Sequence, residues 1–208
     1  MNKQSLATGL LVCGLVALAT VMGVLVAKYQ QSDTPPDIAG LLWPEPKTLS
    51  SFTLIDQENK VFTLADLHGK WSLLFFGFTH CPGPCPTTLA VMKQVREELA
   101  QVRDLQFVFV TVDPDRDTSA RIKQYLASFH PEFVGLGGST EQISALTRQI
   151  GLAYFLDKTE SEENYLVDHS ASLFLVDPQG RLVGIFSAPH ETSSIVDRFD
   201  RIRTFIDG

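Results

Sequence analysis

The sequence predicts an α/β sandwich with a mixed sheet, an N-terminal hairpin and one transmembrane helix ahead of the folded domain. Three observations predict this class: strand and helix patterns alternate along the chain, two strand patterns are almost continuously apolar, and an uncharged run of 22 residues lies near the N-terminus. The 208 residues are 44% hydrophobic and 20% charged, which excludes collagen-like, coiled-coil and disordered proteins. A net charge of −7 argues against a nucleic-acid partner.

The uncharged run Leu6–Ala27 is long enough to cross the ~30 Å hydrocarbon core of a bilayer as a helix. A cleaved signal peptide is the alternative, but its apolar core is ordinarily about 7–15 residues long. A lipoprotein signal fits less well because no small residue precedes Cys13, and an Arg-rich mitochondrial presequence is missing. We therefore expect residues 1–28 to be a short tail and an uncleaved anchor. We expect a single-pass protein of the bacterial inner (cytoplasmic) membrane, with its acidic domain on the periplasmic side.

The next segments lead into the folded domain. Residues 29–48 contain four prolines and no apolar period, which predicts a semi-rigid linker. Residues 49–208 show no repeat and are expected to form one domain. This domain opens with two alternating segments, Ser51–Asp56 and Lys60–Leu64, around a polar turn, which is the pattern of a hairpin.

The centre of the domain is predicted to be a parallel strand pair. Trp71–Phe78 and Leu105–Val112 are the two apolar runs, typical of strands buried on both faces. Between them, Thr87–Val102 has apolar residues near helical spacing, so the three segments indicate a strand–helix–strand crossover. The remaining elements are expected at Thr118–Phe129 (helix), Phe133–Leu136 (strand), Ser139–Gly151 (helix with a capping box), Leu152–Leu156 and Ser172–Val176 (strands), Leu182–Phe186 (hairpin strand) and Glu191–Ile206 (helix).

Two cysteines carry the chemistry of the chain. Cys81 and Cys85 lie where a buried strand gives way to a helix, the end of an α/β sheet at which active groups collect. If both occupy the start of the helix, their α-carbons lie about 6 Å apart, which suits either a disulfide or one shared metal ion. A helix N-terminus is expected to lower a cysteine pKa and favour thiolates, which bind soft metals such as Cu(I). A purely structural pair is the alternative.

A third ligand is expected to be a histidine, because imidazole suits copper in either oxidation state. His169 follows the polar loop Asp157–Asn164, which could carry it over the cysteines. The alternative is a turn histidine that bonds to the loop backbone. Asp113 ends the neighbouring strand and could orient a ligand or merely form a turn. His80 is expected at the rim of the site, and structural roles are expected for His68, His130 and His190.

Three motifs resemble a known family. GFTHCPGPCP, TVDPDRDT and DHSASLFLVDPQG, in this order behind one predicted transmembrane segment, resemble the Sco/SenC family of copper-binding, thioredoxin-like proteins. The resemblance covers roughly residues 49 to 205. It implies a thioredoxin-like three-layer sandwich in which Cys81, Cys85 and His169 bind one copper ion, as Cu(I) or Cu(II). It places Asp113 at the acidic position near the site.

The resemblance also implies a function. Family members help to assemble the dinuclear copper A site in subunit II of cytochrome c oxidase, so the expected protein is a membrane-anchored copper chaperone. An upstream copper donor protein and a thioredoxin-like reductant would be further partners. The sequence Gly83-Pro84 between the cysteines departs from the more usual acidic or aliphatic pair.

Two enzymes remain as alternatives, so whether the protein is an enzyme stays open. The first is a thiol–disulfide oxidoreductase in which Cys81 and Cys85 are the redox-active pair that reduces the cysteines of the target. Ordinary thioredoxin-like enzymes carry two residues between their cysteines rather than three, and they need no distant histidine. The second is a peroxidase, which would need one activated cysteine with a polar stabiliser.

Overall fold

The computed structural model describes most of the chain. It covers residues 13–24, 37–42, 45–157, 166–169 and 171–208, and it describes 156–157 and 166–169 by their backbone alone. The chain divides into two compact units, Met1–Asp37 and Ile38–Gly208. In the first unit residues 13–24 are helical. Within the described part of the chain, the helices are too short or too polar to cross a membrane. The predicted span Leu6–Ala27 extends beyond the described residues on both sides.

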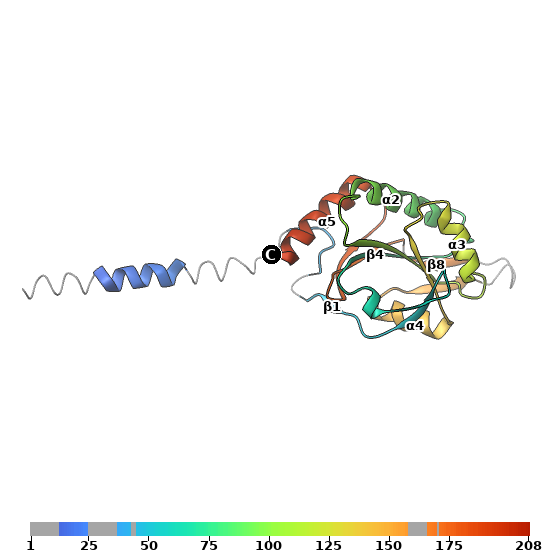
Figure 1. Ribbon diagram of the computed structural model, residues 1–208, viewed down its shortest axis with the longest axis horizontal. Coiled ribbons are helices and arrows are strands. Elements are labelled where there is room, and N and C mark those ends of the chain that lie inside the picture. Colours follow the sequence, from blue (N-terminus) through green and yellow to red (C-terminus); the bar gives the residue numbers. More distant parts are fainter. Residues whose placement is uncertain (1–12, 25–36, 43–44, 158–165, 170) are drawn as a thin grey trace, which may run out of the picture. The chain divides into compact units, whose positions relative to one another are not determined.

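The second unit is built on an eight-stranded sheet (Figure 1), and the sheet is mixed, as the sequence predicted. Its strand order is β1-β10-β9-β4-β5-β6-β2-β3, and β7 and β8 form a separate two-stranded sheet. The strands are β1 Lys47–Thr48, β2 Thr53–Asp56, β3 Val61–Thr63, β4 Trp71–Gly77, β5 Leu105–Thr111, β6 Val134–Gly137, β7 Tyr154–Asp157, β8 Leu166–His169, β9 Leu173–Val176 and β10 Arg181–Phe186. The pairs β4–β5 and β5–β6 are parallel, whereas the other pairs are antiparallel.

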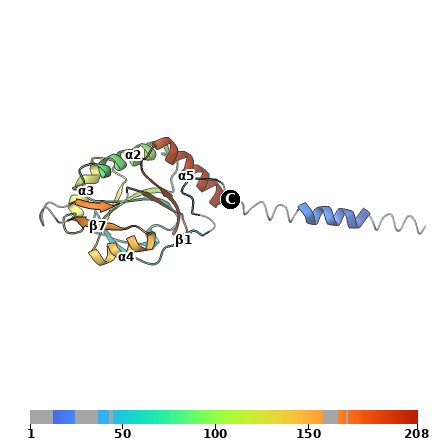
Figure 2. The ribbon, with the colours of Figure 1, turned by 180° about the vertical axis from the view of Figure 1, so that it is seen from behind.

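Four helices complete a three-layer sandwich. They are α2 Pro84–Glu98, α3 Ser119–Ala127, α4 Thr140–Ile150 and α5 Thr192–Asp207, and a short 3₁₀ helix, η1, spans Leu64–Asp66. Figures 1 and 2 show α2, α3 and α5 on one face of the sheet and α4 on the other. All seven residues of β4 are buried between these layers. The ring of Trp71 at the start of β4 packs edge-on against Phe199 of α5, with ring centroids 5.7 Å apart.

Local signals in the sequence predicted the two ends of α4 well. The Ser139 hydroxyl accepts a hydrogen bond from the Gln142 backbone N–H at 3.3 Å, and the Gln142 side chain accepts one from the Ser139 backbone N–H at 2.8 Å. This capping box starts α4 as predicted. Gly151 ends the helix with φ at 78°, a conformation that glycine adopts without strain.

Two short strands lie where the sequence predicted none. Residues Lys47 and Thr48, inside the segment expected to be linker, pair with β10, and Leu41 bridges to Gly184. This pairing satisfies backbone groups of β10 that would otherwise form the edge of the sheet. In addition, β8 pairs with β7 where a loop was expected. The partner of β1 is distant in sequence, and a polar segment of two residues carries little signal for such a pairing.

Candidate metal centre

The two cysteines lie at the junction of β4 and α2. β4 ends at Gly77, and α2 begins at Pro84 with Gly83 as its N-cap residue. Cys85 is therefore in the first turn of the helix, whereas Cys81 precedes it, so the arrangement in which both cysteines open the helix is not the one found. Proline suits this first position because it has no N–H to donate there.

The two thiols are buried side by side. Cys85 is 0% exposed and Cys81 is 9% exposed. The Cys85 backbone N–H donates to the Cys81 sulfur, with a nitrogen-to-sulfur distance of 3.4 Å. The structure holds both residues as thiols rather than as a disulfide. This hydrogen bond holds the two thiols together as a dithiol site, in which only Cys81 has any solvent-exposed area.

Gly77 makes room for this arrangement. A Cβ atom at this position would lie 3.0 Å from the Cys85 sulfur, 3.0 Å from the Phe75 ring and 3.1 Å from the Phe109 ring. These distances are shorter than ordinary van der Waals contacts. Any side chain here would displace the sulfur or the aromatic rings, so the glycine at the end of β4 is part of the thiol site.

The electrostatics of Cys85 differ from the prediction. Hydrogen bonding to Cys81 raises the pKa of the Cys85 thiol well above its ordinary value. Burial raises it further, as do the negative charges of Cys81 and Asp117, while a backbone hydrogen bond with Phe78 opposes the rise. The predicted lowering of the pKa is therefore wrong for Cys85, because the helix N-terminus does not offset a buried position beside another sulfur.

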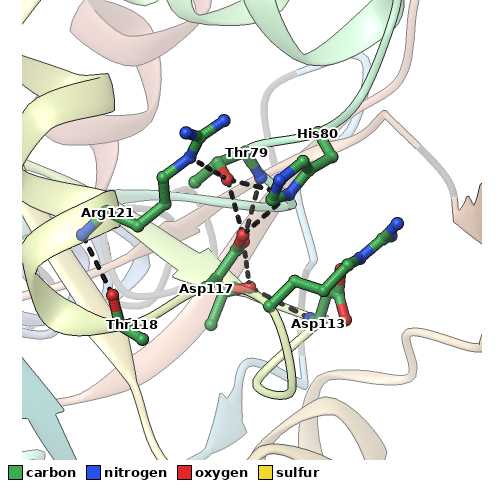
Figure 3. A network of polar contacts seen from close by, with 8 residues as sticks. Thr79, His80, Asp113, Asp117, Thr118 and Arg121 are labelled. Carbon is green, nitrogen blue, oxygen red and sulfur yellow. Dashed lines mark hydrogen bonds and ion pairs between the residues drawn. The ribbon is translucent and has the colours of Figure 1, made fainter. Parts of the chain in front are cut away.

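A hydrogen-bond network holds the segment just before Cys81 (Figure 3). Its centre is Asp117, whose side chain is 0% exposed. The Asp117 carboxylate accepts hydrogen bonds from the Thr79 backbone N–H at 2.9 Å, the Thr79 hydroxyl at 2.6 Å and the Thr111 hydroxyl at 2.6 Å. The network therefore ties the end of β4 to the end of β5 and the start of α3.

His80 and Arg121 complete the outer side of this network. The Arg121 Nε–H donates to the Thr79 hydroxyl at 3.3 Å, and His80 Nδ1 lies 3.2 Å from the same oxygen. His80 Nδ1 also lies 3.5 Å from Asp117 Oδ1, and its side chain is 37% exposed. His80 thus lies at the rim, beside Cys81, in contact with groups that orient the cysteine segment.

Asp113 lies beside Asp117 and His80. Its carboxylate is 1% exposed and forms an ion pair with Arg116. The Arg116 guanidinium lies 5.8 Å from the centre of the Phe78 ring, in the segment that leads to the cysteines. Potential ligand atoms of His80, Asp113 and Asp117 lie within 4.8 Å of one another. Because both carboxylates already have donors, we interpret this group as a structural network.

Sequence reasoning missed Asp117 and Thr79. Taken alone, the sequence TVDPDRDT indicates a turn. The partner of Asp117 is Thr79, which belongs to a different segment, GFTH, at the end of the neighbouring strand. A signal was nevertheless present, because an aspartate that follows one buried strand and a threonine that ends its parallel neighbour lie at the same edge of the sheet.

The structure describes the backbone of His169 and not its side chain. This residue ends β8, where it pairs with Tyr154. The chain then enters β9 at Leu173, which pairs with Phe75 near the end of β4. Because β9 runs antiparallel to β4, it begins at the end of the sheet where the cysteine segment starts. Topology thus brings the backbone of the predicted third ligand to the cysteine end of the sheet.

A groove of about 370 Å³ borders the cysteine segment. Its lining comes from the start of α2 and from two connections across from it: Gly83, Pro84, Thr87, Thr88, Val91, Ala171, Ala188, Pro189 and His190. His190 Nε2 donates a hydrogen bond to the Ala171 carbonyl at 2.6 Å. This bond fixes one side of the groove two residues after His169. His130 lies elsewhere, where its Nδ1 accepts from the Glu132 backbone N–H at 3.2 Å.

Fold and site together define a thioredoxin-like α/β protein with a dithiol where its central strand meets a helix. The family model described as SCO1/SenC matches residues 44–204. The chain therefore belongs to the SCO1/SenC family, as its three motifs indicated.

Individual relatives agree with this assignment. A protein of Stutzerimonas stutzeri described as copper-binding is 43% identical over 151 residues, which cover 72% of this chain and 74% of that protein. A mitochondrial SCO2 homologue of Bos taurus is 39% identical over 153 residues. That alignment covers 72% of this chain but only 58% of the bovine protein.

Solved structures share the fold. The crystal structure of ScoI of Arabidopsis thaliana, with copper bound, has 35% identity and a TM-score of 0.70 and covers 74% of this chain and 98% of that one. BsSco, described as having a disulfide switch and as a member of the Sco family of cytochrome c oxidase assembly proteins, has 25% identity and a TM-score of 0.63. It covers 78% of this chain and 95% of that one.

Proposed function

We propose that this protein is a membrane-anchored copper chaperone of cytochrome c oxidase assembly. It binds one copper ion through Cys81, Cys85 and His169 and delivers the ion to the dinuclear copper A site of subunit II. Two family relations support this proposal: related ScoI from Arabidopsis thaliana holds copper, and BsSco is described as a member of a family of cytochrome c oxidase assembly proteins.

The groove beside the cysteines carries the proposal. Gly83 and Pro84, which lie between the two cysteines, and Ala171, which follows His169 by two residues, line the same groove. The imidazole-bearing segment and the thiol-bearing segment are therefore neighbours across a short gap. This proximity supports a site in which the three side chains bind one ion.

The chemistry follows from the donor set. Two thiolates and an imidazole suit Cu(I), and imidazole also suits Cu(II). The raised pKa of Cys85 means that its proton must leave when the sulfur binds a metal. Copper transfer requires that an acceptor thiolate reach the ion. Cys81, the more exposed of the two cysteines, is the ligand at which such an exchange can begin.

The anchor and location belong to the same proposal. The apolar run Leu6–Ala27 would hold the protein in the bacterial inner membrane, with the copper-binding domain, residues 49–208, on the periplasmic side and residues 29–48 between them. An upstream donor protein would supply copper, and a thioredoxin-like reductant would keep the two cysteines as thiols.

A Cu(I) titration of the full-length chain, purified in detergent, tests the proposal. We expect one ion per chain. We expect Cys85→Ser and His169→Ala each to weaken Cu(I) binding by about tenfold to a hundredfold. Matched controls are Cys13→Ser and His130→Ala, which lie outside the site and should bind as the wild type does. Unchanged affinity and stoichiometry in both ligand variants would contradict the proposal.

A second candidate function is thiol–disulfide exchange with the target. The adjacent buried thiols favour it, as does the disulfide switch described for BsSco. Cys81 would attack one sulfur of a target disulfide, and Cys85 would then displace the target thiolate. The target gains two electrons and two protons, and Cys81 and Cys85 become a disulfide. His169→Ala distinguishes the two functions, because it should weaken copper binding and leave this exchange intact.

A further inference from the structure

His190 forms a hydrogen bond between two connections at the cysteine end of the sheet. It lies between β10 and α5, and its Nε2–H donates to the Ala171 carbonyl, between β8 and β9, at 2.6 Å. Both connections are at this end because Leu173, which begins β9, pairs with Phe75 near the end of β4 and with Phe186 at the end of β10. His190 thus joins segments that are 19 residues apart in sequence.

The ring of His190 is held in place at a cost to stability. Its second nitrogen, Nδ1, is buried and has no hydrogen-bond partner among the described residues. Native proteins keep few such atoms, because a buried polar atom without a partner has lost its hydration and gained nothing in exchange. Within the described part of the chain, the bond from Nε2 to Ala171 is therefore the polar contact that favours a histidine here.

The segment of His190 is tied to the helix that carries Cys85. Thr192, the first residue of α5, donates a hydrogen bond from its hydroxyl to the Gln94 side-chain oxygen of α2 at 2.7 Å. The two helices lie side by side on one face of the sheet (Figures 1 and 2). Ile195, in the first turn of α5, is buried. His190 therefore belongs to a segment that is fixed relative to α2.

Ala171 belongs to the segment of the third proposed ligand. It follows His169, the last residue of β8, by two positions. β8 is part of a two-stranded sheet, which is marginally stable by itself. Ala171 and His190 line the same groove as Gly83 and Pro84, which lie between the cysteines. The hydrogen bond from His190 is thus an added support for the backbone beside His169, and it comes from the side of the thiol helix.

We infer that His190 is a positioning residue for copper binding: its hydrogen bond to the Ala171 carbonyl holds the segment of His169 beside the helix of Cys85. This inference rests on the proposed function, because it needs His169 as a ligand. A ligand that is held near its bound position before the ion arrives loses less conformational entropy on binding. Removal of this one hydrogen bond should therefore weaken the site by a modest factor.

His190→Leu tests the inference, because it removes the N–H donor and keeps a bulky side chain. His190→Gln is the paired variant, because its amide group can donate to the same carbonyl. Cu(I) alone is added to the full-length chain in detergent, in competition with a chelator. We expect roughly fivefold weaker Cu(I) binding in His190→Leu and nearly wild-type binding in His190→Gln. His130→Leu replaces another half-buried histidine with a backbone hydrogen bond, outside the groove, and should bind as the wild type does.

A double-mutant cycle shows whether His190 acts through His169. In a His169→Ala background, His190→Leu should change Cu(I) affinity by less than about twofold, because the ligand that it positions is gone. A general loss of stability would instead weaken binding equally in both backgrounds. Without copper, the amides of Leu166–His169 should exchange roughly fivefold faster in His190→Leu than in the wild type, while those of β4 should not change.

Four outcomes would overturn the inference. They are wild-type Cu(I) affinity in His190→Leu, equal losses in His190→Gln and His190→Leu, an undiminished loss in the His169→Ala background, and unchanged exchange of Leu166–His169 without copper. A failure of the proposed function is distinguishable from these. If His169→Ala weakens binding and His190→Leu does not, the inference fails and the chaperone stands. If His169→Ala binds Cu(I) as the wild type does, the proposed ligand set fails and the inference fails with it.

Discussion

The two halves of the proposed copper site are built in different ways. The thiol half lies where β4, buried along its whole length, meets α2, and Asp117 ties it to the next strand. The backbone of His169 belongs instead to a separate two-stranded sheet, whose strand β7 exposes 69% of Phe155. Two-stranded sheets are marginally stable by themselves. The hydrophobic core thus fixes the position of the two sulfurs, whereas His169 belongs to the β7–β8 sheet, which has only two strands.

The largest effect is expected from breaking the support of the thiol half. Asp117→Ala leaves the Thr79 N–H, the Thr79 hydroxyl and the Thr111 hydroxyl without their buried acceptor. We expect the free energy of unfolding to fall by about 3 kcal/mol, as measured by urea denaturation of the full-length chain. Glu97→Ala, at an exposed position of α2, is the control and should change it by less than about 0.5 kcal/mol. Equal losses in both variants would mean that the network contributes nothing.

A smaller effect is expected from crowding the Cys85 sulfur. Gly77→Ala places a Cβ 3.0 Å from this sulfur and should reduce the free energy of unfolding by about 2 kcal/mol. Cu(I) affinity should fall as well, because the sulfur must move. At Gly137, which ends β6, a Cβ would lie 3.5 Å from its nearest neighbour, an ordinary contact. Gly137→Ala should therefore retain wild-type Cu(I) affinity, and a similar loss there would argue against a steric role for Gly77.

The pH dependence of copper binding tests whether Cys85 is protonated before it binds the ion. The pKa of Cys85 is raised, so this thiol is protonated near neutral pH, and copper must displace the proton. Apparent Cu(I) affinity should therefore rise with pH, by about tenfold per unit, or about 1.4 kcal/mol, from this proton alone. Competition with a chelator at several pH values, corrected for the chelator's own protonation, measures the slope. A flat profile would show that Cys85 does not release a proton on binding.

The smallest effect concerns the ribbon. In hydrogen exchange, amides of β7 and β8 should exchange through local openings, faster than those of β4 and β5. Cu(I) should slow the ribbon amides by roughly fivefold, about 1 kcal/mol, if His169 holds the ion, since opening then breaks a ligand bond. His169→Ala is the control and should lose this slowing. The same slowing in that variant would exclude His169 as a ligand.

Local sequence patterns predicted a helix or strand well where its structure depends only on its own residues. The apolar runs at β4 and β5 and the capping box at Ser139 needed no information from distant residues. β8 could not be predicted, because its pairing with β7 closes a ribbon across a polar segment. Likewise, β1 exists because β10 offers free backbone groups, and a pair of residues such as Lys47 and Thr48 has no periodicity of its own.

The residues of the site were easier to predict from the sequence than the pKa values of those residues. The motif indicated Cys81 and Cys85, and their burial followed from the strand before them. The raised pKa of Cys85 could not be read from a helix start, since it depends on the second sulfur and on Asp117, which comes from another strand end.

The short outer strands have a consequence for the protein at high local concentration. The sheet ends in β1, of two residues, on one side and in β3, of three residues, on the other. Lys47 lies in the first, and Lys60 directly precedes the second. Neither rim is long enough to template a strand from a second molecule, and charge discourages such stacking. We therefore expect little edge-to-edge pairing between the sheets of neighbouring molecules at high protein concentration.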